Sequence, residues 1–289
     1  MWRTIEAMQQ LSQARRLFAE LIRRPDSQLP LAEAALAIAW EDQGGPDPRA
    51  ALAQLDSLAA AASPTVRAAT SPQARVAALN AMLFEQLGFH GDPRCYQQPD
   101  PANSYLDRAI ERRTGLPILL SLIYLEVGWR LGLPLLGLAL PGHFLVRLAD
   151  ENGELYIDPF GGGVLWSLAD CERLIASFYG ELSPEFSTML MAPPTRAAIL
   201  ARILRNLKQT HLARDDAPLT LAAVERLMLL ELSDPGELRD RGLLRLRIGR
   251  IHAAVEDLER YARENPAASD LLEIRGIVHD LMARLAPRN

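Results

Sequence analysis

The stretch that decides the fold runs from Arg113 to Pro134 and reads RTGLPILLSLIYLEVGWRLGLP. Thr114-Gly115 ends one helix, and Pro117 suits the first turn of the next because no backbone N–H is needed there. Apolar side chains then follow on nearly every side of the helix, as far as about residue 131. A helix that is apolar all round is buried, so this segment is predicted to lie at the centre of a domain.

The residues before this helix are also predicted to be helical. Residues from about 10 to 90 carry Ala and Leu at helical spacing and almost no strand signal. Asn103-Ser104 are placed to cap a further helix that runs through Ile110 to Arg113. The sequence therefore predicts an N-terminal helical bundle that packs on the central helix.

Three short strands are predicted after the central helix, over residues 135–140, 143–148 and 155–158. Pro141-Gly142 separates the first two strands, and Asn152-Gly153 is a hairpin signal between the last two. Gly161-Gly162-Gly163 lacks the lysine of a phosphate-binding loop and is predicted to be a flexible turn. Ser167 is predicted to cap the helix that follows.

The chain returns to helices after Pro193-Pro194, and this part repeats itself. The sequences AVERL (223–227) and AVEDL (254–258) lie 31 residues apart, and each leads at the same offset to a proline. A period near 34 residues with paired helices and a terminal proline is the tetratricopeptide pattern. The C-terminal part is therefore predicted to be a helical repeat.

The composition excludes several classes of protein. The net charge of -5 over 289 residues, with Lys208 as the single lysine, argues against a nucleic-acid binder. Two cysteines, Cys95 and Cys171, make neither a disulfide framework nor a four-cysteine zinc site. The longest apolar run, residues 116–125, is too short to span a bilayer, and the N-terminus lacks a signal peptide. A cytoplasmic, reduced protein with no membrane contact is expected.

Four motifs occur in an order that resembles a known family. They are Asn103-Ser104-Tyr105-Leu106, Arg112 to Ile118 (RRTGLPI), Pro141 to Arg147 (PGHFLVR) and Ile157-Asp158-Pro159-Phe160. Together with residues 238–244 of the tail they resemble the SirB-type bacterial proteins, which are transglutaminase-like proteins with tetratricopeptide repeats. The resemblance covers about 95–165 and 195–266.

The resemblance implies an α+β fold with a papain-type core and a small antiparallel sheet. It implies three parts: an N-terminal helical segment (1–92), a transglutaminase-like domain (93–192) and a tetratricopeptide-like tail (193–289). It also implies a triad, in which a Cys opens the buried helix, a His acts as its base and an Asp orients the His. His143 and Asp158 match the last two. The Cys position is occupied by Pro117, which has neither a nucleophile nor a backbone N–H.

Other nucleophiles in the sequence have simpler explanations. Ser121 lies one turn beyond Pro117 on the same helical face, where its hydroxyl is expected to bond back to a helical carbonyl. Cys171 is expected to be a small core residue and Cys95 a surface or half-buried thiol. His143 is either a structural partner of Asp158 or part of a functional pair that lines a pocket.

Binding residues are expected around the same cleft. Asn103, Arg113, Pro117, Ser121 and Arg147 are the candidates, and Arg112 with Arg113 and Arg147 would surround an anion if these arginines are not simply solvated. The five histidines do not pair at metal-ligand spacing, so neither a metal nor a cofactor is expected.

Three functions are compatible with these observations. The leading hypothesis is a non-catalytic interaction or regulatory protein that holds a protein or peptide partner. The alternative is a hydrolase or amidase on peptide-like bonds that uses His143 and Asp158 with water or a non-Cys nucleophile. A small-molecule sensor is the third.

Overall fold

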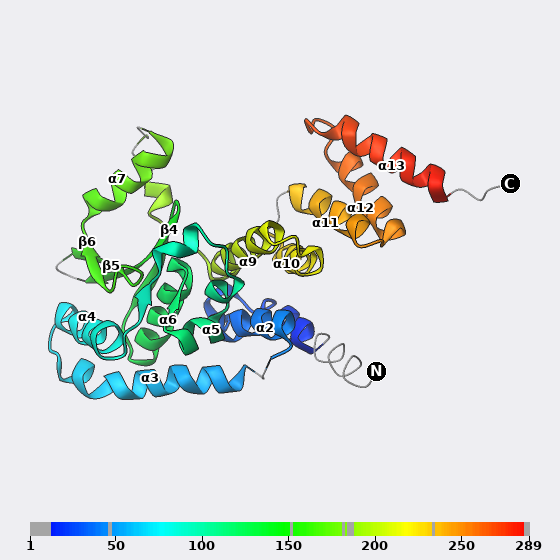
Figure 1. Cartoon of the computed structure of the whole chain (residues 1–289). Helices are drawn as coiled ribbons and strands as arrows, with labels where there is room; N and C mark the ends of the chain where they lie inside the picture. The colour runs from blue at the N-terminus through cyan, green and yellow to red at the C-terminus, as the bar shows by residue number, and fades with distance from the viewer. Residues whose placement is uncertain are drawn as a thin grey trace. The chain divides into compact units, whose positions relative to one another are not determined.

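The computed structural model describes residues 13–45, 48–150, 153–180, 183, 188–232 and 235–285. The chain divides into two compact units, Met1–Ile203 and Leu204–Asn289 (Figure 1). The first unit, here called the sheet unit, contains every strand in the described residues. The second, the repeat unit, is helical. Helix α9 (Arg196–Ala213) begins in the sheet unit and ends in the repeat unit.

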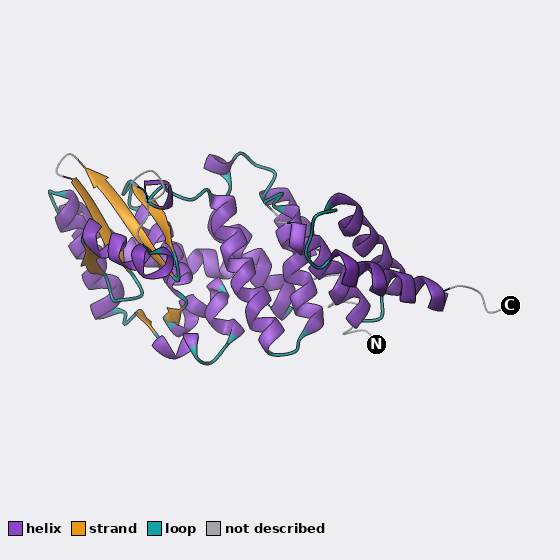
Figure 2. Cartoon of the chain, turned by 90° about the horizontal axis from the view of Figure 1, so that it is seen from above, coloured by secondary structure: helices purple, strands orange, loops and turns teal. Residues whose placement is uncertain are grey.

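Helices lie beside and below the sheet of the sheet unit in the view of Figure 2. Besides helical residues 13–21 and 188–190, they are α2 (Leu31–Gln43), α3 (Arg49–Ala68), α4 (Pro72–Asn80), α5 (Leu106–Arg112), α6 (Pro117–Arg130) and α7 (Leu168–Tyr179). A π-helical turn, Ala81–Gln86, continues α4. Short 3-10 helices η1 (Asp26–Gln28), η3 (Pro93–Tyr96) and η4 (Pro101–Ser104) lie in the connections.

The sheet is a four-stranded antiparallel meander in the order β3-β4-β5-β6. Its strands are β3 (Leu135–Leu140), β4 (His143–Asp150), β5 (Gly153–Asp158) and β6 (Val164–Trp166). The register pairs Leu140 with His143 and Asp158 with Val164. Two short segments, β1 (His90–Gly91) and β2 (Thr114–Gly115), pair in parallel just before α6.

Helix α6 is the centre of the sheet unit, as its apolar composition predicts. Every residue from Pro117 to Gly128 is buried, and the helix packs against α3, α5, β3 and β4. Its one acidic residue, Glu126, accepts the backbone N–H of Ala32 at 3.0 Å and pairs with Arg130. Because the buried carboxylate has these partners, its burial is compatible with a stable core.

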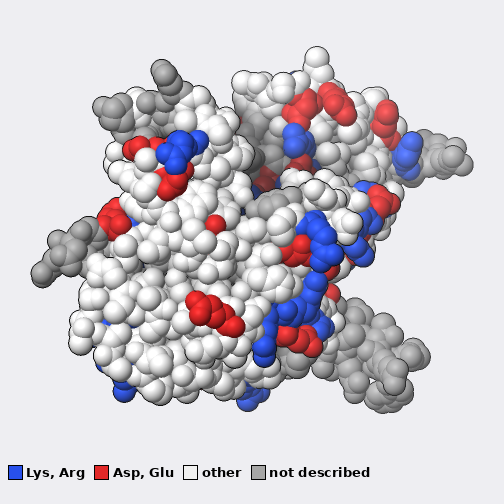
Figure 3. Space-filling view, turned by 60° about the vertical axis from the view of Figure 1, so that its left-hand side comes forward, with Lys and Arg blue, Asp and Glu red and all other residues white. Residues whose placement is uncertain are grey.

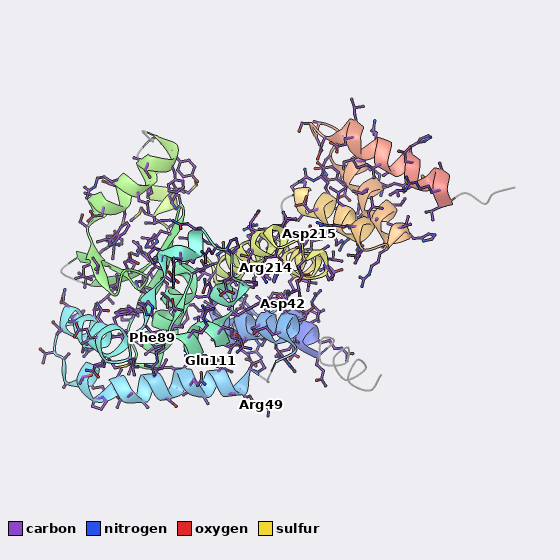
Figure 4. The ribbon with its side chains drawn as sticks, viewed as in Figure 1. Asp42, Arg49, Phe89, Glu111, Arg214 and Asp215 are labelled. Carbon is purple, nitrogen blue, oxygen red and sulfur yellow. The ribbon has the colours of Figure 1, made fainter. Side chains whose placement is uncertain are left out.

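Polar contacts join α2 to α5 and the residue before it. The Tyr105 hydroxyl donates to Asp42, which Figure 4 labels on α2, at 3.1 Å. Arg108 donates to the Gln43 side chain at 2.6 Å. The N-terminal helices are therefore fastened to the segment that leads into α6.

The repeat unit consists of helix pairs that pack on their neighbours. Its helices, after the end of α9, are α10 (Ala217–Leu229), α11 (Pro235–Arg247), α12 (Ile251–Glu264) and α13 (Leu271–Leu285). The two copies of the sequence repeat lie in α10 and α12, so they occupy equivalent helices. The buried residues Leu258, Tyr261 and Ile274 form part of a core that α12 and α13 share.

The α+β class is confirmed, and the predicted central helix and strand starts agree closely with α6, β3 and β4. One predicted helix cap is wrong. Asn103 and Ser104 do not cap α5, because they belong to η4, and the N-cap of α5 is Tyr105 without a side-chain hydrogen bond. Strand β6, which lies between the glycine run and Ser167, is not among the predicted strands. The turn at residues 151–152 lies outside the described residues.

Candidate functional site

The pair expected from the sequence, His143 and Asp158, meets at one end of the sheet. His143 is the first residue of β4 and Asp158 the last of β5, and these strands are antiparallel neighbours. Nε2 of His143 lies 3.0 Å from Oδ1 of Asp158, and both side chains are largely buried. The ring N–H is not directed at the carboxylate, so the contact lacks hydrogen-bond geometry.

Aromatic side chains form two walls around the imidazole ring. Trp166 of β6 stacks on it with ring centres 5.5 Å apart and an interplanar angle of 14°. Phe160 meets it edge-on, at 5.9 Å and 89°. Such contacts orient a ring without any hydrogen bond, so packing, more than Asp158, fixes the position of His143.

The turn after Asp158 is held in place at several points. Oδ1 of Asp158 accepts the Phe160 N–H at 3.0 Å, and its carbonyl accepts the Gly163 N–H at 2.7 Å. The Asn80 amide donates to the Gly163 carbonyl at 2.8 Å, and the buried Tyr124 hydroxyl donates to Oδ1 of Asn80 at 2.8 Å. The glycine run, predicted to be a flexible turn, is therefore fastened to α4 and through it to α6.

Arg202 of α9 contacts the first two residues of β4. One guanidinium nitrogen donates to the His143 carbonyl at 2.8 Å. The guanidinium carbon also lies 5.7 Å from the centre of the Phe144 ring, within the range of a cation–π contact. Arg202 is thus a backbone support for the strand that carries His143.

Pro117, at the position that the resemblance assigns to a nucleophilic Cys, is the first residue of α6 and is buried. The residue before it, Leu116, donates its N–H to the Asn103 carbonyl at 2.9 Å. Asn103 is itself buried, and its Oδ1 has no partner within the described residues. This hydrogen bond brings Asn103 close to the start of α6, where Pro117 lies.

The other candidate nucleophiles are occupied or buried. Ser121 is fully buried and donates to the Phe144 carbonyl at 2.9 Å, so its hydroxyl bonds a strand carbonyl and not the expected helical one. Cys171 is fully buried in α7, and burial, with a smaller effect of Asp170, raises the pKa of its thiol to about 11. Burial also raises the pKa of the Cys95 thiol in η3 above its ordinary value. Neither cysteine has the low pKa of a nucleophilic thiolate.

The three arginines proposed as an anion site have separate partners. Arg112 pairs with Asp100 at 2.9 Å, and Arg113 donates to the Leu87 carbonyl at 2.7 Å. Arg147 pairs with Glu154 of the neighbouring strand at 3.1 Å. Each of the three guanidinium groups thus bonds a different acceptor, and the described contacts give no support to a shared anion site.

The surface beside the pair is apolar. Val164, Leu165, Leu168 and Phe178 are all at least half exposed on β6 and α7. Phe178 covers the β3–β4 turn, since a Cβ on Gly142 would lie 2.9 Å from its ring. The face brought forward in Figure 3 is mostly uncharged, with a few Lys, Arg, Asp and Glu side chains scattered over it. Among the described residues no group of three or more His, Cys, Asp or Glu side chains could hold a metal ion, and no helix is long and apolar enough to cross a membrane.

Sequence reasoning missed the residues that support the pair: Trp166, Asn80 and Arg202. None of them lies next to His143 or Asp158 in the sequence. The one available signal was the position of Trp166, which directly precedes the helix cap at Ser167. The other two come from helices far along the chain, and only the tertiary fold brings them to the site.

A buried helix followed by two strands that bring a His and an Asp together at one end of the sheet is the arrangement that the resemblance to transglutaminase-like proteins implied. The sequence model of the transglutaminase-like superfamily matches residues 49–205, and that of a tetratricopeptide repeat matches residues 207–279. The chain therefore belongs to the transglutaminase-like superfamily, among the SirB1-type proteins with C-terminal tetratricopeptide repeats.

Several similar curated proteins are bacterial and are matched over most of their length. A UPF0162 protein of Xylella fastidiosa is 38% identical over 209 residues, which cover 72% of this chain and 74% of that protein. A UPF0162 protein of Pseudomonas aeruginosa is 32% identical over 69% of this chain and 72% of its own. Protein SirB1 of Salmonella typhimurium is 27% identical over 74% of this chain and 78% of its own. No solved structure matches the chain.

Proposed function

We propose that this protein is a non-catalytic member of its superfamily that acts by binding a protein or peptide partner. The observation that carries the proposal is Pro117, the buried first residue of α6. Acyl transfer at this position needs a nucleophile, and proline supplies neither a thiol nor a backbone N–H for the oxyanion. Loss of one such N–H alone typically raises a reaction barrier by about 2.7–4 kcal/mol.

The remaining nucleophiles support the same proposal. Ser121 has its hydroxyl engaged by the Phe144 carbonyl. Both cysteines have pKa values raised by burial, so their thiols are protonated near neutral pH. The His143 ring lies between aromatic walls, an environment that suits a structural role for the pair.

The repeat unit supports the binding role. Tetratricopeptide helices stack into a surface that is used to hold other chains, and the repeat model matches residues 207–279. The cytoplasm is the compartment that we propose, because both cysteines are free thiols and reduced thiols are usual there.

A turnover assay separates this proposal from the hydrolase alternative. The full chain is incubated with a panel of peptide amides, peptide esters and glutamine-containing peptides, and product is measured by mass spectrometry. We expect no product above the buffer control for the wild type, for His143→Ala or for Asp158→Asn. His279→Ala, a change of an exposed histidine on α13, is the matched control. Wild-type turnover that disappears in His143→Ala but not in His279→Ala, at unchanged melting temperature, would establish the hydrolase instead.

A further inference from the structure

The repeat unit contains a groove with a polar end and an apolar end. The polar end is a cavity of about 590 Å³ between α9, α11 and the α12–α13 turn, and its lining includes Arg205, Lys208, Arg239, Asp240 and Asp270. A smaller hollow of about 230 Å³ is lined largely by apolar groups, including Leu212 and Leu244. Lys208 and Asp240 line both, so the two hollows are neighbours with this ion pair at their boundary. They are together called the α9–α11 groove below.

The two aspartates of the groove already have partners for both of their oxygens. Asp240 accepts from Arg239 on Oδ1, at 3.0 and 2.8 Å, and from Lys208 on Oδ2, at 2.5 Å. Asp270 accepts from the Tyr261 hydroxyl on Oδ1 at 2.8 Å and from Arg239 on Oδ2 at 2.7 Å. Arg239 therefore holds both aspartates, and these carboxylates have little acceptor capacity left for a ligand.

The side of the groove formed by α9 has N–H donors that are not used in short hydrogen bonds. Arg205 is about half exposed, and its contacts are long: 3.5 Å to the Leu232 carbonyl and 3.7 Å to Glu237. A guanidinium–carboxylate hydrogen bond is normally 2.7–2.9 Å. Lys208 uses one of its three N–H groups on Asp240, and the exposed Gln209 also faces the cavity. The buried carboxylate of Glu237 also lines the cavity. Beside it, the α9 side of the groove offers hydrogen-bond donors, two of them cationic, to a ligand that brings acceptors.

The apolar end lies one helical turn further along α9. Leu212 is 46% exposed although it lines the hollow with Leu243 and Leu244. Residues 208 and 212 are four apart, which is about 6 Å along a helix. In an extended peptide, side chains two positions apart lie on the same side and are separated by about 6.6 Å. The spacing of the two ends therefore matches two alternate side chains of an extended peptide.

We propose that the α9–α11 groove binds an extended peptide segment in which an acidic side chain and an apolar side chain are two positions apart. The acidic group meets Arg205 and Lys208, and the apolar group fills the hollow beside Leu212. The inference rests on the proposed binding function and names the chemistry of its partner.

A randomised peptide pool tests this inference. The full chain is immobilised and exposed to nonapeptides with blocked ends and all positions randomised, and the retained peptides are sequenced. We expect enrichment of Asp or Glu two positions from Leu, Ile, Met or Phe. One enriched peptide is then synthesised with a fluorescent label, and its Kd is measured with the full chain.

Two variants probe the two ends of the groove separately. Arg205→Gln leaves the Lys208–Asp240–Arg239 contacts in place, and Leu212→Asp changes an exposed side chain, so both are expected to fold. Arg205→Gln should weaken binding by about tenfold or more, the effect of one lost charge-assisted hydrogen bond, and remove the preference for the acid. Leu212→Asp should remove the preference for the apolar residue. Arg284→Gln, at an exposed arginine near the end of α13, should change nothing.

The peptide experiment and the turnover assay test different proposals. Enrichment of another motif, or equal binding by Arg205→Gln and the wild type, would overturn the groove chemistry and leave the binding role standing. Retention of no peptide would also overturn it. The proposed function itself fails only if the turnover panel gives His143-dependent product.

Discussion

The side-chain amide of Asn80 donates to the Gly163 carbonyl at 2.8 Å, so the end of α4 holds the turn that follows Asp158. The approach is close enough that the turn needs a glycine. Gly163 has φ +83°, and a Cβ there would lie 2.7 Å from the Asn80 amide and from the Phe84 ring. The position of the turn and the His143–Asp158 contact therefore both depend on Gly163.

Gly163→Ala should accordingly destabilise the chain more than a glycine change at a comparable backbone angle. Gly44, with φ +60° and open space where a Cβ would lie, is the matched control. Gly44→Ala should cost about 1–2 kcal/mol of unfolding free energy from the left-handed conformation alone. Gly163→Ala adds displacement of Asn80 and Phe84, about 1–3 kcal/mol more. Urea unfolding of both variants measures the difference, and equal losses would show that the turn moves freely.

Cys171 should be unreactive in the folded chain. At pH 8 a thiol with a pKa of about 11 is ionised in about one molecule in a thousand, and this side chain is also fully buried. Reaction with a disulfide reagent should therefore modify the partly exposed Cys95 first, with Cys171 following only on unfolding. Cys95→Ser identifies the fast phase. Equal rates for the two thiols in the native chain would contradict the burial of Cys171.

The same pKa shift predicts a dependence of stability on pH. The folded pKa of Cys171 lies above its ordinary value of 9.0. The folded state therefore favours the neutral thiol, and this contribution is fully present below pH 9. It is lost as the pH rises from about 9 toward 11, because the unfolded chain ionises first. Cys171→Ala should show a shallower loss of unfolding free energy over that range than the wild type.

Pro117→Cys should not restore acyl transfer. The substitution returns a thiol to the start of α6, where the helix dipole favours a thiolate, but the position is buried. The partner base, His143, is packed between Trp166 and Phe160. The peptide-ester panel measures the outcome. Product that appears with Pro117→Cys and disappears with Pro117→Cys/His143→Ala would show that only the nucleophile is missing from a working site.

The part of the fold that the sequence predicted well depends on local signals. Gly115, Pro117 and Pro134 set the limits of α6, and its uniform apolar composition predicts its burial. Pro141-Gly142 predicts the turn that makes His143 the first residue of β4. Proline and glycine are strong sequence signals for element boundaries, because proline restricts the backbone angles and glycine relaxes them.

The part that could not be predicted depends on long-range contacts. The cap at Asn103 failed because Asp100 begins a separate 3-10 turn there. The partners of Arg113 and Ser121 are main-chain carbonyls 26 and 23 residues away, and no local pattern specifies such a distance. The limits 93–192 of a separate transglutaminase-like domain stay a prediction.

The strongest single stability effect is expected at Asp257 in the repeat unit. This aspartate of α12 is buried and accepts from Arg241 at 2.8 and 2.6 Å and from Arg245 at 2.8 Å. Asp257→Asn leaves the mostly buried Arg241 without this counter-charge and Arg245 with only its longer contact to Glu225 at 3.4 Å. Breaking a buried pair in this way typically costs about 3–5 kcal/mol. The control is Asp215→Asn, which breaks the exposed pair with Arg247 (Asp215 is labelled in Figure 4). An exposed pair contributes about 0–1 kcal/mol.

Urea unfolding followed by circular dichroism and by tryptophan fluorescence measures the effect of Asp257→Asn in each unit. All four tryptophans precede residue 204, so fluorescence reports the sheet unit while circular dichroism also reports the repeat helices. The helical signal should be lost at lower urea in Asp257→Asn, with Asp215→Asn close to the wild type. If Asp257→Asn and Asp215→Asn unfold at the same urea concentration, the buried arginine pair does not hold α11 to α12, and apolar packing around Leu258 does so instead.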